Sequence, residues 1–133
     1  MERYSQNALE VAQHLKKSSK IESVSYPGLP SDIDYPLTQK YLKKGASGVI
    51  TFVIKGGRAA AVRFMDAMKL ASRVVHVADI RTCVLHPASS THRQLTDQQL
   101  LAAGINPGMI RFSCGLEHIS DIIEDIDQAL EKV

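Results

Sequence analysis

The residue whose type and position most clearly imply chemistry is Arg111, because it lies inside the otherwise apolar segment Met109–Cys114. Side chains alternate between the two faces of a strand, so Ile110 and Phe112 face a core while Arg111 lies on the opposite face. A guanidinium group stays charged and offers a rigid fork of N–H donors that suits a carboxylate or a phosphate. The residues alone leave two alternatives open, an ion pair with one of the chain's own acids or an anionic ligand.

Other residues that perform chemistry in proteins are present without a recognisable arrangement. His86 and His92 flank two serines, and Cys83 and Cys114 lie in predicted strands. The spacing matches no zinc-ligand pattern, and no strand–turn–helix elbow surrounds the serines. Lys55–Arg58 precedes a helix but lacks the P-loop pattern, which favours a plain tight turn. We therefore expect no metal site and no catalytic residue in this chain.

Composition indicates an ordinary folded domain. The chain has 133 residues, of which 44% are hydrophobic and 23% charged, with a net charge of +2. This length supports one domain with its own core. The charge is too small to imply nucleic acid or a membrane as partner, and no apolar run reaches the length of a membrane span. Two cysteines without CxxC spacing and no secretory leader favour reduced thiols and a cytoplasmic location.

Helical and strand patterns alternate along the chain. Helices are predicted over Tyr4–Lys17, over Asp34–Lys44, after Gly57, after a capping box formed by Thr96 and Gln99, and from Ile119 onward. Strands are predicted over Ile21–Ser25, Gly48–Lys55, Arg73–Val77, Thr82–His86 and around Arg111.

These elements predict an α/β fold, an α+β two-layer sandwich in which a small mixed or antiparallel sheet is covered by helices on one face. Gly48–Lys55 is apolar on both sides, so it is expected to be central in the sheet. In the last helix the isoleucines are expected to face the core, and the acids, Asp125 among them, are expected to face water. The sheet face that carries Arg111 is then left to meet another body.

Six segments occur in an order that resembles a known family. They are Ser25–Pro30, Lys44–Phe52, Lys55–Gly57, His86–His92, Gln94–Ile105 and Gly108–Ile119. Over nearly the whole chain they resemble the C-terminal domain of the Cys/Met-metabolism family of pyridoxal 5'-phosphate (PLP) enzymes, which belong to fold type I. The Lys55–Gly57 turn, the run that starts at His86 and the sequence Glu117–Ile119 resemble most closely the O-acetylhomoserine sulfhydrylase branch. Cystathionine γ-synthases and methionine γ-lyases are the alternative branches.

The resemblance implies a role for four residues. Arg111 matches the arginine that binds the α-carboxylate of the amino-acid substrate. The segment Arg73–Asp79 matches a stretch that lines the same pocket, which places His76 and Val77 there, although relatives commonly have serine or asparagine where His76 stands. Thr91 matches a residue of the supporting loop. The resemblance thus implies that the chain contributes to substrate binding.

The resemblance also implies what the chain does not carry. The family's Schiff-base lysine and phosphate-binding loop belong to a large N-terminal domain, and no lysine here lies in a matching motif. Residues 1–133 are therefore expected to be the C-terminal domain of a larger enzyme, inactive alone and without bound PLP. Its expected partners are its own N-terminal domain, the amino-acid substrate and further copies in a tetramer. A stand-alone, non-catalytic α/β binding or assembly module is the alternative from another class of protein.

Overall fold

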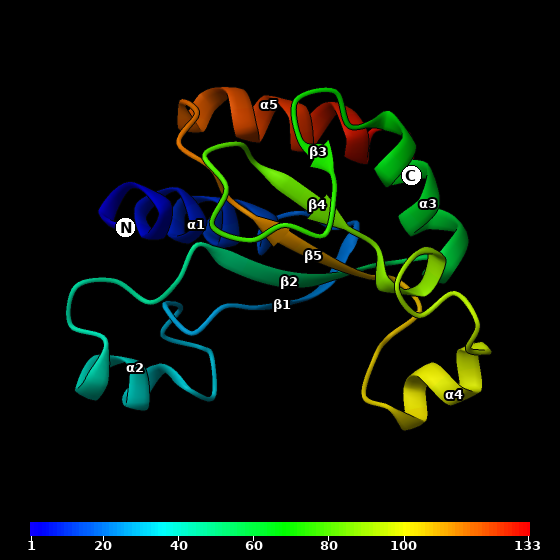
Figure 1. Cartoon of the computed structure of the whole chain (residues 1–133), viewed down its shortest axis with the longest axis horizontal. Coiled ribbons are helices and arrows are strands. Elements are labelled where there is room, and N and C mark those ends of the chain that lie inside the picture. Colours follow the sequence, from blue (N-terminus) through cyan, green and yellow to red (C-terminus); the bar gives the residue numbers. More distant parts are fainter.

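The computed structural model describes residues 1–133 and places helices over one face of a five-stranded sheet (Figure 1). The helices are α1 (Glu2–Leu15), α2 (Tyr35–Tyr41), α3 (Gly57–Ala67), the 3-10 helix η1 (Pro87–Ser89), α4 (Asp97–Ala102) and α5 (Ile119–Leu130). The strands are β1 (Ile21–Ser25), β2 (Val49–Ile54), β3 (Ser72–Arg73), β4 (Cys83–Leu85) and β5 (Met109–Ser113).

The strand order is β1-β2-β5-β4-β3. The β1–β2, β2–β5 and β5–β4 pairs are antiparallel, and β3 runs parallel to β4 at the edge. The sheet is therefore mixed, and β2 and β5 form its middle. The prediction of a mixed α/β fold with β2 inside the sheet is confirmed.

Alternating side chains of β2 and β5 build the core. Ile50, Phe52 and Ile54 are buried on the helix side of β2, and the same side of β5 buries Ile110 and Phe112. The ring of Phe52 meets that of Phe64 from α3 edge to face, with centroids 5.8 Å apart, an arrangement that aromatic pairs favour. One continuous cluster thus joins the sheet to the helices above it.

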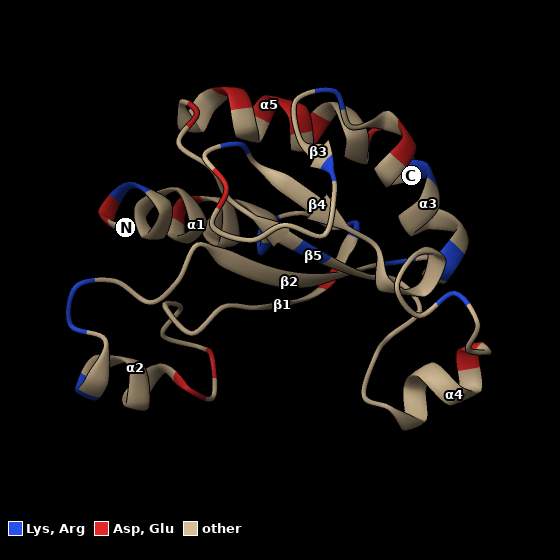
Figure 2. Ribbon diagram, viewed as in Figure 1, with Lys and Arg blue, Asp and Glu red and all other residues tan.

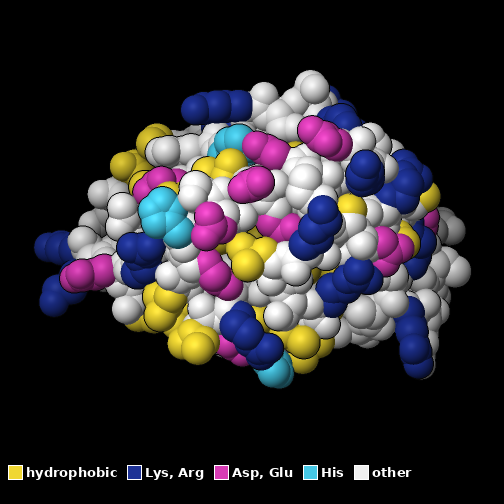
Figure 3. All heavy atoms as spheres, turned by 90° about the horizontal axis from the view of Figure 1, so that it is seen from above, with side chains coloured by type: hydrophobic (Ala, Val, Ile, Leu, Met, Phe, Trp, Pro, Cys, Tyr) yellow, Lys and Arg dark blue, Asp and Glu magenta, His cyan; other side chains and the backbone are white.

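Helices α1, α3 and α5 cover this core with one apolar side each (Figure 1). In α1 the buried residues include Val11 and Leu15, and in α5 they include Ile122 and Ile126. Acidic residues recur along α5 (Figure 2), and the helix-covered face of the molecule carries both acidic and basic side chains (Figure 3). Charged residues on the solvent side are typical of an amphipathic helix. No helix is long and apolar enough to cross a membrane.

Helices α2 and α4 extend away from the layers, at opposite ends of the sheet (Figure 1). The start of α4 is as predicted, because Thr96 and Gln99 form a reciprocal capping box. Gly104, with φ of +76°, follows its end and satisfies the left-handed conformation that closes many helices. Helix α2 is shorter than the predicted Asp34–Lys44, and Thr38 is its only buried residue.

The prediction that Asp125 faces water is wrong. Asp125 is buried, and its carboxylate accepts hydrogen bonds from the backbone N–H groups of Lys69, Leu70 and Ala71 at 2.8, 2.9 and 3.0 Å. Its position between Ile122 and Ala129 at helical spacing places it on the core side of α5. The carboxylate ties the chain after α3 to α5 because it satisfies three successive backbone donors, of which the N–H of the buried Ala71 would otherwise lack a partner.

The predicted strand over residues 73–77 needs correction, because β3 ends at Arg73 and residues 74–77 do not continue it. Beyond that point its neighbour β4 soon reaches Pro87, which has no N–H group to extend a ladder. Cys83 of β4 is buried, pairs in register with Ser113 and lies outside the helix-side core cluster. The thiol therefore belongs to the same sheet side as Arg111.

Candidate substrate-binding site

Arg111 is at the centre of the sheet face that no helix covers. In register it lies between Thr51 of β2 and Leu85 of β4, and it is half-buried. It is the only basic residue of β5. The neighbouring side chains are uncharged, so the guanidinium group is held on a rigid and largely apolar surface.

Arg111 forms no ion pair with an acid of its own chain. Every ion pair in the molecule involves other residues. The only hydrogen bond of the guanidinium group runs from Nη2 to the backbone oxygen of Val75, at 2.6 Å. Its remaining N–H groups have no partner within the protein. A half-buried cation with unused donors is suited to bind an anionic ligand, often with two parallel hydrogen bonds.

The residue that holds Arg111 belongs to a loop, residues 74–82, between β3 and β4. Val75, Val77 and Ile80 of this loop are exposed, at 57%, 52% and 68%. Ala78 adopts a left-handed conformation with φ of +58°, which is strained for a residue with a Cβ atom. This 74–82 loop therefore presents apolar side chains beside the guanidinium group and carries strain at its tip.

Asp79 is the charged centre of the 74–82 loop. Its carboxylate accepts hydrogen bonds from the backbone N–H of Arg81 at 3.0 Å and from Nη2 of Arg81 at 3.0 Å, and it lies 3.4 Å from Nδ1 of His76. The hydrogen bonds from Arg81 hold the pKa of the Asp79 carboxyl well below its usual range. Asp79 is therefore ionised at any pH at which the protein works.

Glu117 fastens the other end of the same loop. Its carboxylate accepts hydrogen bonds from the backbone N–H and the hydroxyl of Thr82, at 2.6 and 2.9 Å. A side chain at Gly115 would collide with backbone atoms of Ile80 and Arg81, so glycine is required where β5 passes the loop. Sequence reasoning missed Glu117 and Thr82. An acid directly after a buried strand and glycine was the available signal.

The structure brings together three of the four predicted substrate-binding residues. His76 and Val77 directly follow Val75 and so lie in the loop that contacts Arg111. Thr91 lies after η1, is exposed, and pairs its hydroxyl with Nδ1 of His92 at 2.9 Å. No hydrogen bond joins Thr91 to Arg111 or to the 74–82 loop, and its role stays a prediction.

The remaining histidines and cysteines do not assemble into a site. No three His, Cys, Asp or Glu side chains are grouped so that they could hold a metal ion. Burial raises the pKa of the Cys83 thiol, and it raises that of Cys114 to about 12. Both cysteines are free thiols and remain protonated, which makes them poor nucleophiles.

His86 has a structural environment. It is fully buried, its Nδ1 lies 2.8 Å from the Ser89 hydroxyl, and its Nε2 lies 2.8 Å from the backbone oxygen of Pro107. Burial lowers the pKa of His86, because the charged form is poorly solvated inside the protein. The imidazole is therefore neutral and joins η1 to the segment before β5.

We expect acidification to destabilise the fold through His86. The unfolded chain binds a proton at this residue near pH 6.5, whereas the folded chain resists it. Stability should therefore fall as the pH drops from about 6.5 through the lowered pKa of the folded state. Unfolding in urea at about pH 7.5 and about pH 5 measures this loss. His86→Gln should lose less between the two pH values, and His92→Gln, an exposed control, should lose as much as the wild type.

An equally steep loss in His86→Gln would show that other groups cause the pH dependence.

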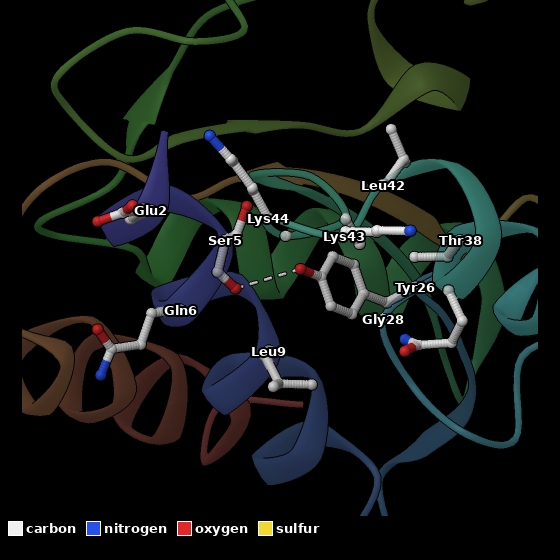
Figure 4. A pocket seen from close by; sticks show the side chains of 13 residues that line it. Glu2, Ser5, Gln6, Leu9, Tyr26, Gly28, Thr38, Leu42, Lys43 and Lys44 are labelled. Carbon is white, nitrogen blue, oxygen red and sulfur yellow. Dashed lines mark hydrogen bonds between the residues drawn. The ribbon is translucent and has the colours of Figure 1, made fainter.

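A separate cavity of about 410 Å³ lies between α1, α2 and the Tyr26 turn (Figure 4). The buried Tyr26 hydroxyl is within hydrogen-bond distance of the backbone oxygens of Ser47 and Ser5, at 2.9 and 3.2 Å. Burial raises the pKa of this phenol. The cavity is lined mainly by polar side chains of α1 and of the segment after α2, and by neither Arg111 nor the 74–82 loop.

Comparison with known proteins identifies the family. The sequence pattern of the Cys/Met metabolism PLP-dependent enzymes matches residues 1–131. The chain belongs to this family. Among similar members are an O-acetyl-L-homoserine sulfhydrylase of Leptospira meyeri, with 46% identity over 100% of this chain and 30% of the relative, and a homocysteine synthase of Schizosaccharomyces pombe, with 47% identity over 98% and 30%. An L-methionine γ-lyase of Fusobacterium nucleatum is 41% identical over 100% and 33%.

A solved structure shares the fold of this Cys/Met-metabolism chain. It is a Campylobacter jejuni protein described as an O-acetylhomoserine (thiol)-lyase, with a TM-score of 0.89, 40% identity and coverage of 98% of this chain and 31% of its own. That protein carries a pyridoxyl-lysine monophosphate group. The chain described here therefore has the fold of part of a fold-type I PLP enzyme, and it spans about 30% of the length of the curated relatives.

The residues of this chain do not fit the cofactor by themselves. A lysine that forms a Schiff base lies in an enclosed site where its amine can become neutral. Eight of the nine lysines here are exposed. The ninth, Lys20, donates from Nζ to the backbone oxygens of Leu130 and Val133 at the end of α5. No step on the cofactor is therefore assigned to this chain.

Proposed function

We propose that this chain is the substrate-carboxylate-binding part of a PLP-dependent O-acetylhomoserine sulfhydrylase. The reaction replaces the acetate on the γ-carbon of O-acetylhomoserine by sulfide, and it yields homocysteine and acetate. In the assembled enzyme PLP supplies the electron sink that lets bonds near the amino-acid α-carbon break and form. The names of the two most similar relatives above support the choice of this reaction.

One observation carries the proposal. Arg111 projects from the uncovered sheet face with a single hydrogen bond, to a backbone oxygen, and with its other donors unused. A substrate carboxylate fits these donors and would be held in one orientation, which determines the bond that lies in line for cleavage. His76 and Val77 then form the wall beside the carboxylate, and Thr91 supports the pocket from the segment after η1.

The organisation of the whole protein is part of the proposal. Residues 1–133 would be a C-terminal domain that closes one wall of a cleft over an N-terminal PLP domain. The protein would act in the cytoplasm as a tetramer. The chain spans about 30% of the length of its relatives, which supports the presence of a further domain in the whole protein. A PLP-binding lysine encoded upstream would distinguish this organisation from a stand-alone module.

The test is an assay of the full-length protein with three nucleophiles. With O-acetylhomoserine and sulfide we expect homocysteine and acetate to form in equal amounts. L-cysteine or water in place of sulfide should give far slower turnover. Cystathionine formed from cysteine as fast as homocysteine is formed from sulfide would identify a cystathionine γ-synthase instead. Rapid release of methanethiol from methionine would identify a γ-lyase, the activity named for the Fusobacterium relative.

A further inference from the structure

Arg111 is oriented by a backbone carbonyl group and not by a side chain. The bond from its Nη2 to the Val75 oxygen is 2.6 Å long, and it uses one edge of the guanidinium group. The direction of the free edge therefore depends on where the 74–82 loop places the Val75 carbonyl. Side chains that fix this loop can therefore control the direction in which Arg111 binds a substrate carboxylate, without touching the substrate themselves.

The loop is not held by its own packing. Val75 and Val77 are more than half exposed, so little buried apolar surface stabilises this conformation. The left-handed Ala78 opposes it, since a Cβ atom disfavours that backbone conformation. Polar contacts must therefore keep the segment from Val75 to Asp79 in place.

Asp79 provides these contacts at the tip of the loop. Its Oδ1 accepts the Arg81 backbone N–H at 3.0 Å, and its Oδ2 accepts Arg81 Nη2 and faces His76 Nδ1. The His76 contact joins the two ends of the segment 76–79, which contains Ala78 and directly follows Val75. The Asp79 side chain is only 19% exposed, while that of Arg81 is 55% exposed, so the carboxylate is the enclosed member of the group.

Residues 80–82, at the end of the 74–82 loop, are held by other contacts. The backbone N–H of Leu116 donates to the oxygen of Ile80 at 2.8 Å, and Glu117 holds Thr82. Leu116 and Glu117, which follow β5, therefore hold residues 80–82 in place. The contacts of Asp79 with Arg81 and His76 extend this restraint to the neighbouring Val75. We infer that Asp79 is a positioning residue that aims Arg111 at the substrate carboxylate, an inference that rests on the proposed function.

The test compares Asp79→Ala and Asp79→Asn with a matched control in the full-length enzyme. Alanine removes both carboxylate oxygens, so KM for the amino-acid substrate should rise about tenfold or more, as a small misplacement of a binding group can cause. The kcat value and the absorbance of bound PLP should change little. Asparagine retains an acceptor for the Arg81 N–H and should give a smaller rise. Asp66→Ala removes the carboxylate that pairs with Arg73 just outside the loop, at a more exposed position (65% against 19% for Asp79), and should leave KM unchanged.

A double-mutant comparison separates this inference from the proposed function. In an Arg111→Ala background, Asp79→Ala should add no more than about a twofold change in KM, because the residue acts through Arg111. A KM for Asp79→Ala like that of the wild type, or a full effect in the Arg111→Ala background, would overturn the positioning role. If Arg111→Ala itself left KM unchanged, the proposed function would fail instead. Arg81→Ala, which removes only a side-chain partner of Asp79, gives a second variant should Asp79→Ala not fold, and it should also raise KM.

Discussion

Replacement of Arg111 by alanine in the full-length protein should raise KM for the amino-acid substrate by roughly 100- to 1000-fold, the effect of removing one partner from a desolvated, hydrogen-bonded ion pair. The kcat value should fall much less at saturating substrate, and PLP should remain bound. Thermal stability of the chain should change little, because Arg111 makes a single hydrogen bond within the protein. Steady-state kinetics and the cofactor absorbance spectrum measure these effects.

Two controls establish that Arg111 recognises a carboxylate. Arg111→Lys keeps the charge but cannot form two parallel hydrogen bonds, so its KM should lie between those of wild type and the alanine variant. A substrate analogue with a carboxamide in place of the α-carboxylate should bind poorly to the wild type and no worse to Arg111→Ala. If the alanine variant still discriminated strongly between carboxylate and carboxamide, another residue would have to bind the α-carboxylate.

Asp125→Ala should be the most destabilising single substitution of a charged residue in the chain. It leaves the N–H groups of Lys69, Leu70 and Ala71 without the acceptor that now lies 2.8 to 3.0 Å away. The loss of three charge-assisted hydrogen bonds, one of them from the N–H of the buried Ala71, corresponds to roughly 3–5 kcal/mol of unfolding free energy. Urea denaturation of the chain, followed by circular dichroism, measures the loss.

Variants on the same helix provide the comparison. Asp125→Asn keeps one carbonyl oxygen and should lose less stability than alanine does. Glu124→Ala, at an exposed neighbouring position, should change the unfolding free energy by no more than about 0.5 kcal/mol. Equal effects for positions 124 and 125 would mean that the hydrogen bonds to the 69–71 segment contribute nothing net to stability.

The periodicity of the sequence was sufficient to predict the layers of this fold. Alternation around Arg111 and the apolar run of β2 identified the central strands, because strands buried on one or both faces leave a direct signature in residue type. The stretch Arg73–Val77 has equally strand-like residues, but it forms a loop after Arg73. Its outcome depends on how far the neighbouring strand β4 extends, which local preference does not record.

The site was predicted only in part, because the sequence shows residue types but not backbone contacts. The residue type of Arg111 predicted an anion or an acid as partner, but a backbone oxygen is the only hydrogen-bond acceptor that its guanidinium group meets within the chain. Every residue has a backbone carbonyl group, so no sequence pattern can indicate Val75 as the partner. Asp125 was misjudged although its spacing from Ile122 and Ala129 placed it on the core side, since acids are rarely buried unless several donors meet them.

The order of the strands has a consequence for how the protein is made. β5, which joins the β1–β2 pair to the β3–β4 pair, is the last of the five strands to be synthesised. Until the ribosome has released residues 109–113, the two halves of the sheet have no common neighbour, and the backbone N–H and C=O groups of their facing edges stay unpaired. Pairings between distant segments form slowly, and open strand edges favour aggregation. Chains that terminate before β5 therefore cannot assemble the five-stranded sheet.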